Sequence, residues 1–110
     1  MNILTICEGG NVRSVGLARL LKNNPRHHNV VAIGAGWALD VNNGRQPGFM
    51  LSDWAQMIVI MSEHFLSGVP IMPHNAHKVK ICEVGRDVYG NPSHPDLIAK
   101  CEAWISKEGL

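Results

Sequence analysis

The sequence predicts an α/β fold, a three-layer sandwich in which helices cover both faces of a four-stranded parallel sheet. Apolar, strand-like segments alternate with segments of helical periodicity along the 110 residues. The segment 57–61 is apolar throughout, as a strand buried on both faces requires. The length is close to the commonest domain size, and 45% apolar residues suffice for one core. We therefore expect 1–110 to form a single domain.

The first half of the chain predicts two strands, one helix and a loop. Asn2–Cys7 is a short apolar strand, and Ser14–Asn23 places its leucines on one helical face. Pro25 follows that helix and ends it. Asn29–Ile33 is rich in β-branched residues and predicts the second strand. Residues 37–47 are rich in Asn, Gly and Asp, which indicates a loop.

The middle of the chain predicts two short helices around the central strand. Gly48–Trp54 is long enough for a short helix, and the strand 57–61 follows it. Ser62 is placed to cap another short helix, which would run to about Ser67 and end at Gly68.

The last part of the chain predicts a strand and a helix. Two prolines, Pro70 and Pro73, argue against regular structure before Val79–Val84, the predicted fourth strand. Pro95 fits the first position of a final helix with apolar residues on one face. In a sheet of this class, ligands bind beyond the carboxyl ends of the strands. Cys7 stands at such an end.

The segment after the first strand carries the pattern Cys-x5-Arg-Ser, from Cys7 through Arg13 to Ser14. A turn of backbone amides, a helix start and a guanidinium form a site for a tetrahedral oxyanion. The helix start and the cation favour the thiolate, which is the nucleophile. Ser14 could cap the helix or donate its hydroxyl to the sulfur. Besides Cys7 and Arg13, the residues expected to bind the anion are Glu8, Gly9, Gly10, Asn11, Val12 and Ser14.

This pattern resembles the signature of the low-molecular-weight protein tyrosine phosphatases, an apolar strand followed by Cys-x5-Arg-Ser and a helix. Ala32–Gly36 and Ser52–His64 are similar to two further segments of that family, and Asp87–Gly90 resembles its Asp-Pro-Tyr-Gly. The resemblance implies a phosphatase-like domain that hydrolyses phosphotyrosine or a similar aryl phosphate through a phosphocysteine intermediate. The expected partner is thus a phosphorylated protein or a small aryl phosphate. In the family the aspartate of that motif is the general acid, which here is Asp87.

The position of Asp87 supports the same role. A leaving oxygen needs a proton donor, and the same carboxylate can then activate the hydrolytic water. Asp87 follows the predicted fourth strand, on the ligand-binding side of the sheet. Asp40 and Asp53 are the alternative acids. Tyr89 is expected either to wall a slot for a phenyl ring or to pack on the sheet edge.

The chain departs from the family pattern within the loop from Cys7 to Arg13, which is expected to bind the anion. Gly10 stands where the family usually has Asn, and Val12 stands where a second cysteine often follows. Glu8 replaces a usually apolar residue and adds negative charge at the rim, which would weaken phosphate binding or select a basic leaving group. The motif at Asp87 lacks its proline, and the loop after the second strand is short.

The residues leave two alternative functions open. An arsenate reductase on the same fold would need Cys82 or Cys101 exposed near the loop, whereas their apolar settings predict inert core thiols. A phosphate- or phosphoprotein-binding module would use the loop without turnover.

Composition excludes several other classes. A net charge of +1 gives no basic surface for nucleic acid. No run approaches the ~18 apolar residues of a membrane helix, and the N-terminus does not resemble a signal peptide, so we expect a cytoplasmic protein without membrane contact. The paired histidines lack neighbouring ligands, and we expect neither a metal nor a cofactor.

Overall fold

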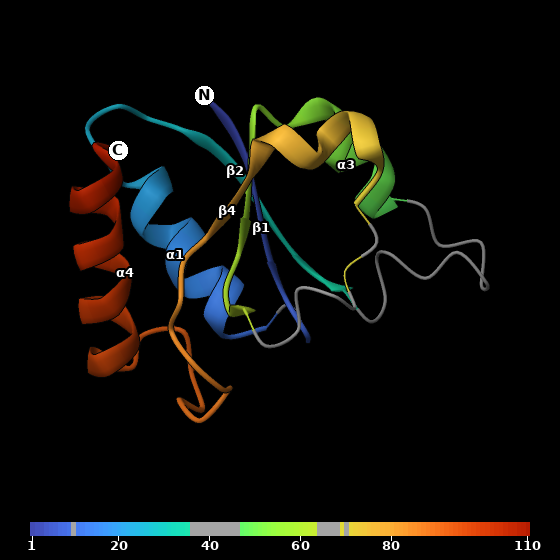
Figure 1. The fold of residues 1–110 in the computed structure, drawn as a ribbon. Helices are drawn as coiled ribbons and strands as arrows, with labels where there is room; N and C mark the ends of the chain where they lie inside the picture. Colours follow the sequence, from blue (N-terminus) through green and yellow to red (C-terminus); the bar gives the residue numbers. More distant parts are fainter. Residues whose placement is uncertain (10, 36–46, 64–68, 70) are drawn as a thin grey trace.

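The computed structural model describes residues 1–9, 11–35, 47–63, 69 and 71–110. Strands and helices alternate through most of this part of the chain (Figure 1). The elements are β1 (Asn2–Cys7), α1 (Arg13–Lys22), β2 (Asn29–Gly34), α3 (Pro47–Trp54), β3 (Met57–Ile60), the 3-10 helix η3 (Pro73–Lys78), β4 (Val79–Ile81) and α4 (Pro95–Glu108).

The four strands form one parallel sheet in the order β2-β1-β3-β4. Because β1 and β3 are the inner strands, nearly all of their residues are buried. In β1, Ile3 and Cys7 join one core cluster, while Leu4 and Ile6 join the other. The alternation follows from the two-residue period of a strand, and it gives the sheet an apolar layer on each face.

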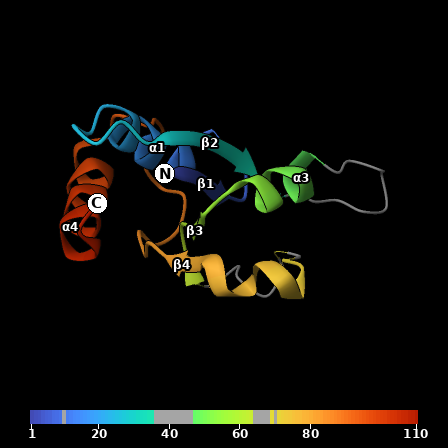
Figure 2. The same ribbon diagram turned by 90° about the horizontal axis from the view of Figure 1, so that it is seen from above.

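Helices cover both faces of this sheet. Helices α1 and α4 pack on one face through Leu17, Leu97 and Trp104, and α3 covers the other face (Figure 2). The indole of Trp104 also donates to the Ile81 carbonyl at the end of β4, at 2.9 Å. The predicted three-layer sandwich with a four-stranded parallel sheet is therefore confirmed.

The segment before β4 differs from the prediction. Pro73 was expected to exclude regular structure, yet it begins η3. Proline is tolerated in a first helical turn, where its missing N–H has no acceptor to lose. Strand β4 ends at Ile81, but the amide of Cys82 still donates to the Ile60 carbonyl at 2.9 Å. The chain thus stays beside β3 after the regular strand ends.

Two predicted segments fall largely on residues outside those described, namely the loop at 37–47 and the short helix after Ser62. The hydroxyl of Ser62, expected to cap that helix, donates to the Glu83 carboxylate at 2.9 Å. None of the helices in the described ranges combines the length and apolar character needed to cross a bilayer.

Candidate active site

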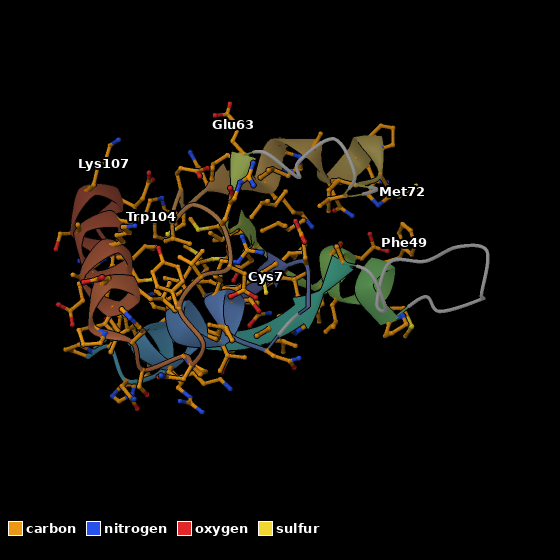
Figure 3. All side chains as sticks on the ribbon, turned by 90° about the horizontal axis from the view of Figure 1, so that it is seen from below. Cys7, Phe49, Glu63, Met72, Trp104 and Lys107 are labelled. Carbon is orange, nitrogen blue, oxygen red and sulfur yellow. The ribbon has the colours of Figure 1, made fainter. Side chains whose placement is uncertain are left out.

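Cys7 is the last residue of β1 and pairs in register with Gly34, the last residue of β2. Its side chain lies against the first turn of α1 (Figure 3) and is 2% exposed. The Sγ of Cys7 is 3.1 Å from the Oγ of Ser14. The hydroxyl of Thr5 donates to the Ser14 carbonyl at 2.9 Å. This bond ties β1 to the helix start and fixes Ser14 beside the sulfur.

Helix α1 begins at Arg13, directly after the loop of the Cys-x5-Arg pattern. Its N-cap residue, Val12, makes no side-chain capping hydrogen bond, and no acidic residue lies in its first turn. The first amides of a helix point outward along its axis and carry partial positive charge. Ser14 lies inside the helix, so of its two expected roles the structure gives it the contact with sulfur.

Arg13 is almost completely buried, with 1% of its surface exposed. Its Nη1 donates to the carbonyl of Gly85 at 2.9 Å. Gly85 has a φ of +79°, a backbone conformation that glycine adopts without strain. The guanidinium therefore joins the loop after β1 to the loop after β4.

We define the acid loop as residues 83–90, which follow β4. Asp87 is exposed in this loop, inside a tight turn closed by the Val88 amide and the Arg86 carbonyl at 2.9 Å. The carboxylate of Glu83 accepts hydrogen bonds from the Ser62 hydroxyl and the Gly85 amide. Cys7 is at the carboxyl end of β1, and Asp87 follows the carboxyl end of β4.

Asp53 lies at the opposite edge. It stands near the end of α3, shortly before β3 begins, and Gln56 bonds to Asn2 at the start of β1. Its carboxylate accepts from Asn75 at 2.8 Å and contacts His74 at 2.7 Å. These hydrogen bonds, Asn75 first, lower the pKa of Asp53. The other alternative acid, Asp40, lies outside the described residues.

Of the two roles expected for Tyr89, walling a slot or packing against the fold, the geometry agrees with packing. The side chain is only 6% exposed and belongs to the core cluster. Its hydroxyl donates to the Val84 carbonyl and accepts from Lys100 Nζ at 2.9 Å. A phenol carries both an apolar ring and a polar tip, and here both are satisfied inside the protein. Sequence reasoning missed Lys100, which has no local signal beyond its place on α4.

The remaining loop residues differ in their exposure. Glu8, Gly9 and Asn11 are exposed, and Val12 packs against the core cluster. A methyl group added at Gly9 would approach only the Asn11 amide, at 3.9 Å. Gly10 lies outside the described residues.

Cys82 and Cys101 are completely buried, and their thiols contact each other. The hydrogen bond between them, with burial, raises the pKa of Cys82, while the same bond lowers that of Cys101. The sequence predicted two inert core thiols but not their pairing. Among the described residues, no three His, Cys, Asp or Glu side chains gather as a metal site requires.

Comparison with known proteins gives matches only at the level of structure. No family model matches the chain, and no curated protein matches its sequence. Solved structures do match over nearly the whole chain.

The matching structures include known phosphatases. Wzb of Vibrio vulnificus, in complex with benzylphosphonate, has a TM-score of 0.69 at 16% identity, covering 96% of this chain and 97% of its own. The tyrosine phosphatase Wzb of Escherichia coli K30, in complex with sulphate, has a TM-score of 0.66 at 18% identity, covering 98% of each chain. The YwlE arginine phosphatase of Geobacillus stearothermophilus has a TM-score of 0.63 at 15% identity, covering 98% of this chain and 92% of its own. The chain therefore has the fold of the low-molecular-weight tyrosine phosphatases, as its sequence motifs predicted.

Proposed function

We propose that this protein is a cysteine-dependent phosphomonoesterase that acts on phosphotyrosine or a similar aryl phosphate. The observation that carries the proposal is the position of Cys7, at a strand end, 3.1 Å from the Ser14 hydroxyl and facing the start of α1. A thiolate is stabilised by a hydroxyl donor and by a helix N-terminus. The fold shared with known phosphatases supports the same reaction class.

The first chemical step transfers the phosphoryl group to sulfur. The Cys7 Sγ attacks phosphorus, an S–P bond forms, and the bond from phosphorus to the leaving oxygen breaks. Asp87 gives its proton to that oxygen, so that the leaving group departs as a neutral phenol. The second step reverses the proton flow. Asp87 takes a proton from water, the water oxygen bonds to phosphorus, and the S–P bond breaks to give inorganic phosphate and the Cys7 thiolate.

Arg13 and the amides around the start of α1 hold the transferred group. A guanidinium has five N–H donors in a rigid fork, so it can hold the Gly85 carbonyl and phosphoryl oxygens together. Since phosphoryl transfer depends mainly on positioning and charge stabilisation, this preformed arrangement suits the reaction. The bond to Gly85 also holds the acid loop beside the anion site.

The structure does not favour the arsenate reductase alternative. That reaction needs a second cysteine that can reach the product at the loop, but Cys82 and Cys101 are both 0% exposed and contact each other. We therefore keep the phosphatase as the single proposed activity.

The decisive test is hydrolysis of p-nitrophenyl phosphate by the wild type and by Cys7→Ser. We expect turnover in the wild type and none in the variant, while Cys82→Ala, the matched cysteine control, keeps its activity. Turnover that survives Cys7→Ser would show the assignment to be wrong. A wild type that binds phosphate or vanadate without turnover would identify a binding module instead.

The acid is tested separately. Asp87→Asn should lower kcat by roughly 10² to 10⁴, the range for loss of a general acid. Asp53→Asn is the matched control, because Asp53 lies at the other edge of the sheet. A loss confined to Asp53→Asn would move the acid away from Asp87.

A further inference from the structure

The acid loop is closed at its base by one side chain. The hydroxyl of Tyr89 donates to the carbonyl of Val84, so the two ends of the segment 84–89 are joined. Asp87 lies between these ends. Tyr89 and Val84 are both buried in the core cluster, whereas Asp87 is exposed. The proposed acid therefore projects from a short loop whose base is anchored in the core.

Lys100 holds the same hydroxyl from α4. Its Nζ donates to the Tyr89 oxygen at 2.9 Å and lies 5.4 Å from the centre of the Tyr89 ring. His94 also contacts the Tyr89 ring, with 5.5 Å between the ring centroids and an angle of 65° between the ring planes. An ammonium donor leaves the hydroxyl proton to point at Val84, because Lys has no acceptor of its own. The orientation of the phenol is thereby fixed.

A second anchor holds the loop on its inner side. The carbonyl of Gly85, the residue after Val84, accepts from Arg13 in the anion site. Asp87 thus lies in the chain between two anchored residues, Gly85, which Arg13 holds, and Tyr89. A change at Tyr89 would let the Asp87 carboxylate move relative to the leaving oxygen. The loop from Cys7 to Arg13 would be unaffected.

We propose that Tyr89 and Lys100 are positioning residues for the general acid Asp87. They act through the acid loop and touch no reacting atom. This inference rests on the proposed phosphatase function and deepens it. A positioning role predicts a selective defect, since only substrates with poor leaving groups depend on a well-placed proton donor.

The test compares two aryl phosphates in kcat/KM, which reports the step in which the leaving group departs. Phenyl phosphate releases a weakly acidic phenol, with a pKa of ~10 like that of tyrosine. Dinitrophenyl phosphate releases a far more acidic phenol. For Tyr89→Phe we expect a loss of about 10- to 100-fold on phenyl phosphate, the range for a misplaced catalytic group. On dinitrophenyl phosphate the loss should stay below about twofold.

Lys100 variants and a double mutant complete the test. Lys100→Met should show the same selective loss, and Lys100→Arg, which keeps a cationic donor, should restore most of the activity. Lys107→Met is the control on the same helix, where Lys107 is exposed. In the Asp87→Asn background, Tyr89→Phe should add no further loss of activity, because both changes remove the same function, proton donation by Asp87.

Equal losses on both substrates, or a full additional loss in the Asp87→Asn background, would overturn the positioning role while leaving the phosphatase assignment intact. A wild type that hydrolyses neither substrate would instead refute the proposed function itself.

Discussion

Gly16→Ala tests how tightly α1 is packed against the start of α4. Gly16 is buried in α1, and a β-carbon built there would lie 2.9 Å from Leu97 Cδ2 and 3.1 Å from the Pro92 carbonyl oxygen. Neither neighbour can move freely. Leu97 is completely buried in the core cluster, and the Pro92 oxygen belongs to the backbone.

Two opposing effects determine how much Gly16→Ala changes the free energy of unfolding. Alanine in a helix interior is favoured over glycine by ~1 kcal/mol. Overpacking a well-filled core costs ~1–3 kcal/mol. A contact of 2.9 Å with a buried leucine, together with one of 3.1 Å to a backbone oxygen, places this site in the upper part of that range. We therefore expect a net destabilisation of ~1–2 kcal/mol, which lowers Tm by roughly 4–8 °C in a domain of this size.

Thermal and urea denaturation measure the effect, with Arg19→Ala on the exposed face of α1 as control. Leu97→Val in the same chain provides a stricter check, since removing the contacting methyl group should make Gly16→Ala neutral or stabilising. A single Gly16→Ala variant with a raised Tm would refute the packing argument, because helix propensity alone would then decide the outcome.

Two further predictions concern Ser14 and His28. Ser14→Ala removes the hydroxyl beside Cys7, and since a hydrogen bond to a charged group is worth ~1.5–3 kcal/mol, kcat/KM on an aryl phosphate should fall about 10- to 100-fold. Ser106→Ala on α4 is the control, and a loss below twofold would contradict the contact. Burial, then the N-terminal charge, lowers the pKa of His28 from 6.5, so stability should fall as pH drops below ~6.5. The wild type should lose Tm between pH 7.5 and 5.5, and His28→Asn should lose less. His27→Asn, the control, should lose as much as the wild type. If His28→Asn also loses as much as the wild type, His28 is not the source of the pH dependence.

Local sequence signals predicted the elements that position the site. Asn2–Cys7 is recognisable as a buried strand because most of its residues are apolar, and the helix after Arg13 has clear periodicity. Topology alone also predicts that Asp53 lies away from Cys7. A residue just before a parallel strand lies at the amino edge of the sheet, opposite Cys7.

Contacts between distant segments could not be predicted in this way. The direction of Tyr89 depends on Lys100 and on the Val84 carbonyl, and no periodicity encodes such a three-way contact. The pairing of the Cys82 and Cys101 thiols likewise arises only when α4 packs beside the end of β4. The 3-10 helix at Pro73 is hard to predict because a proline can either exclude regular structure or begin a helix.

The central claim is that Cys7 carries the phosphoryl group during turnover. The most direct measurement is the intact mass of the protein, acid-quenched within milliseconds of mixing with excess aryl phosphate. We predict a transient species heavier by one phosphoryl group, mapped by peptide analysis to Cys7, absent from Cys7→Ser and longer-lived in Asp87→Asn, where water is no longer activated. Turnover of the aryl phosphate without any phosphorylated Cys7 would contradict the account.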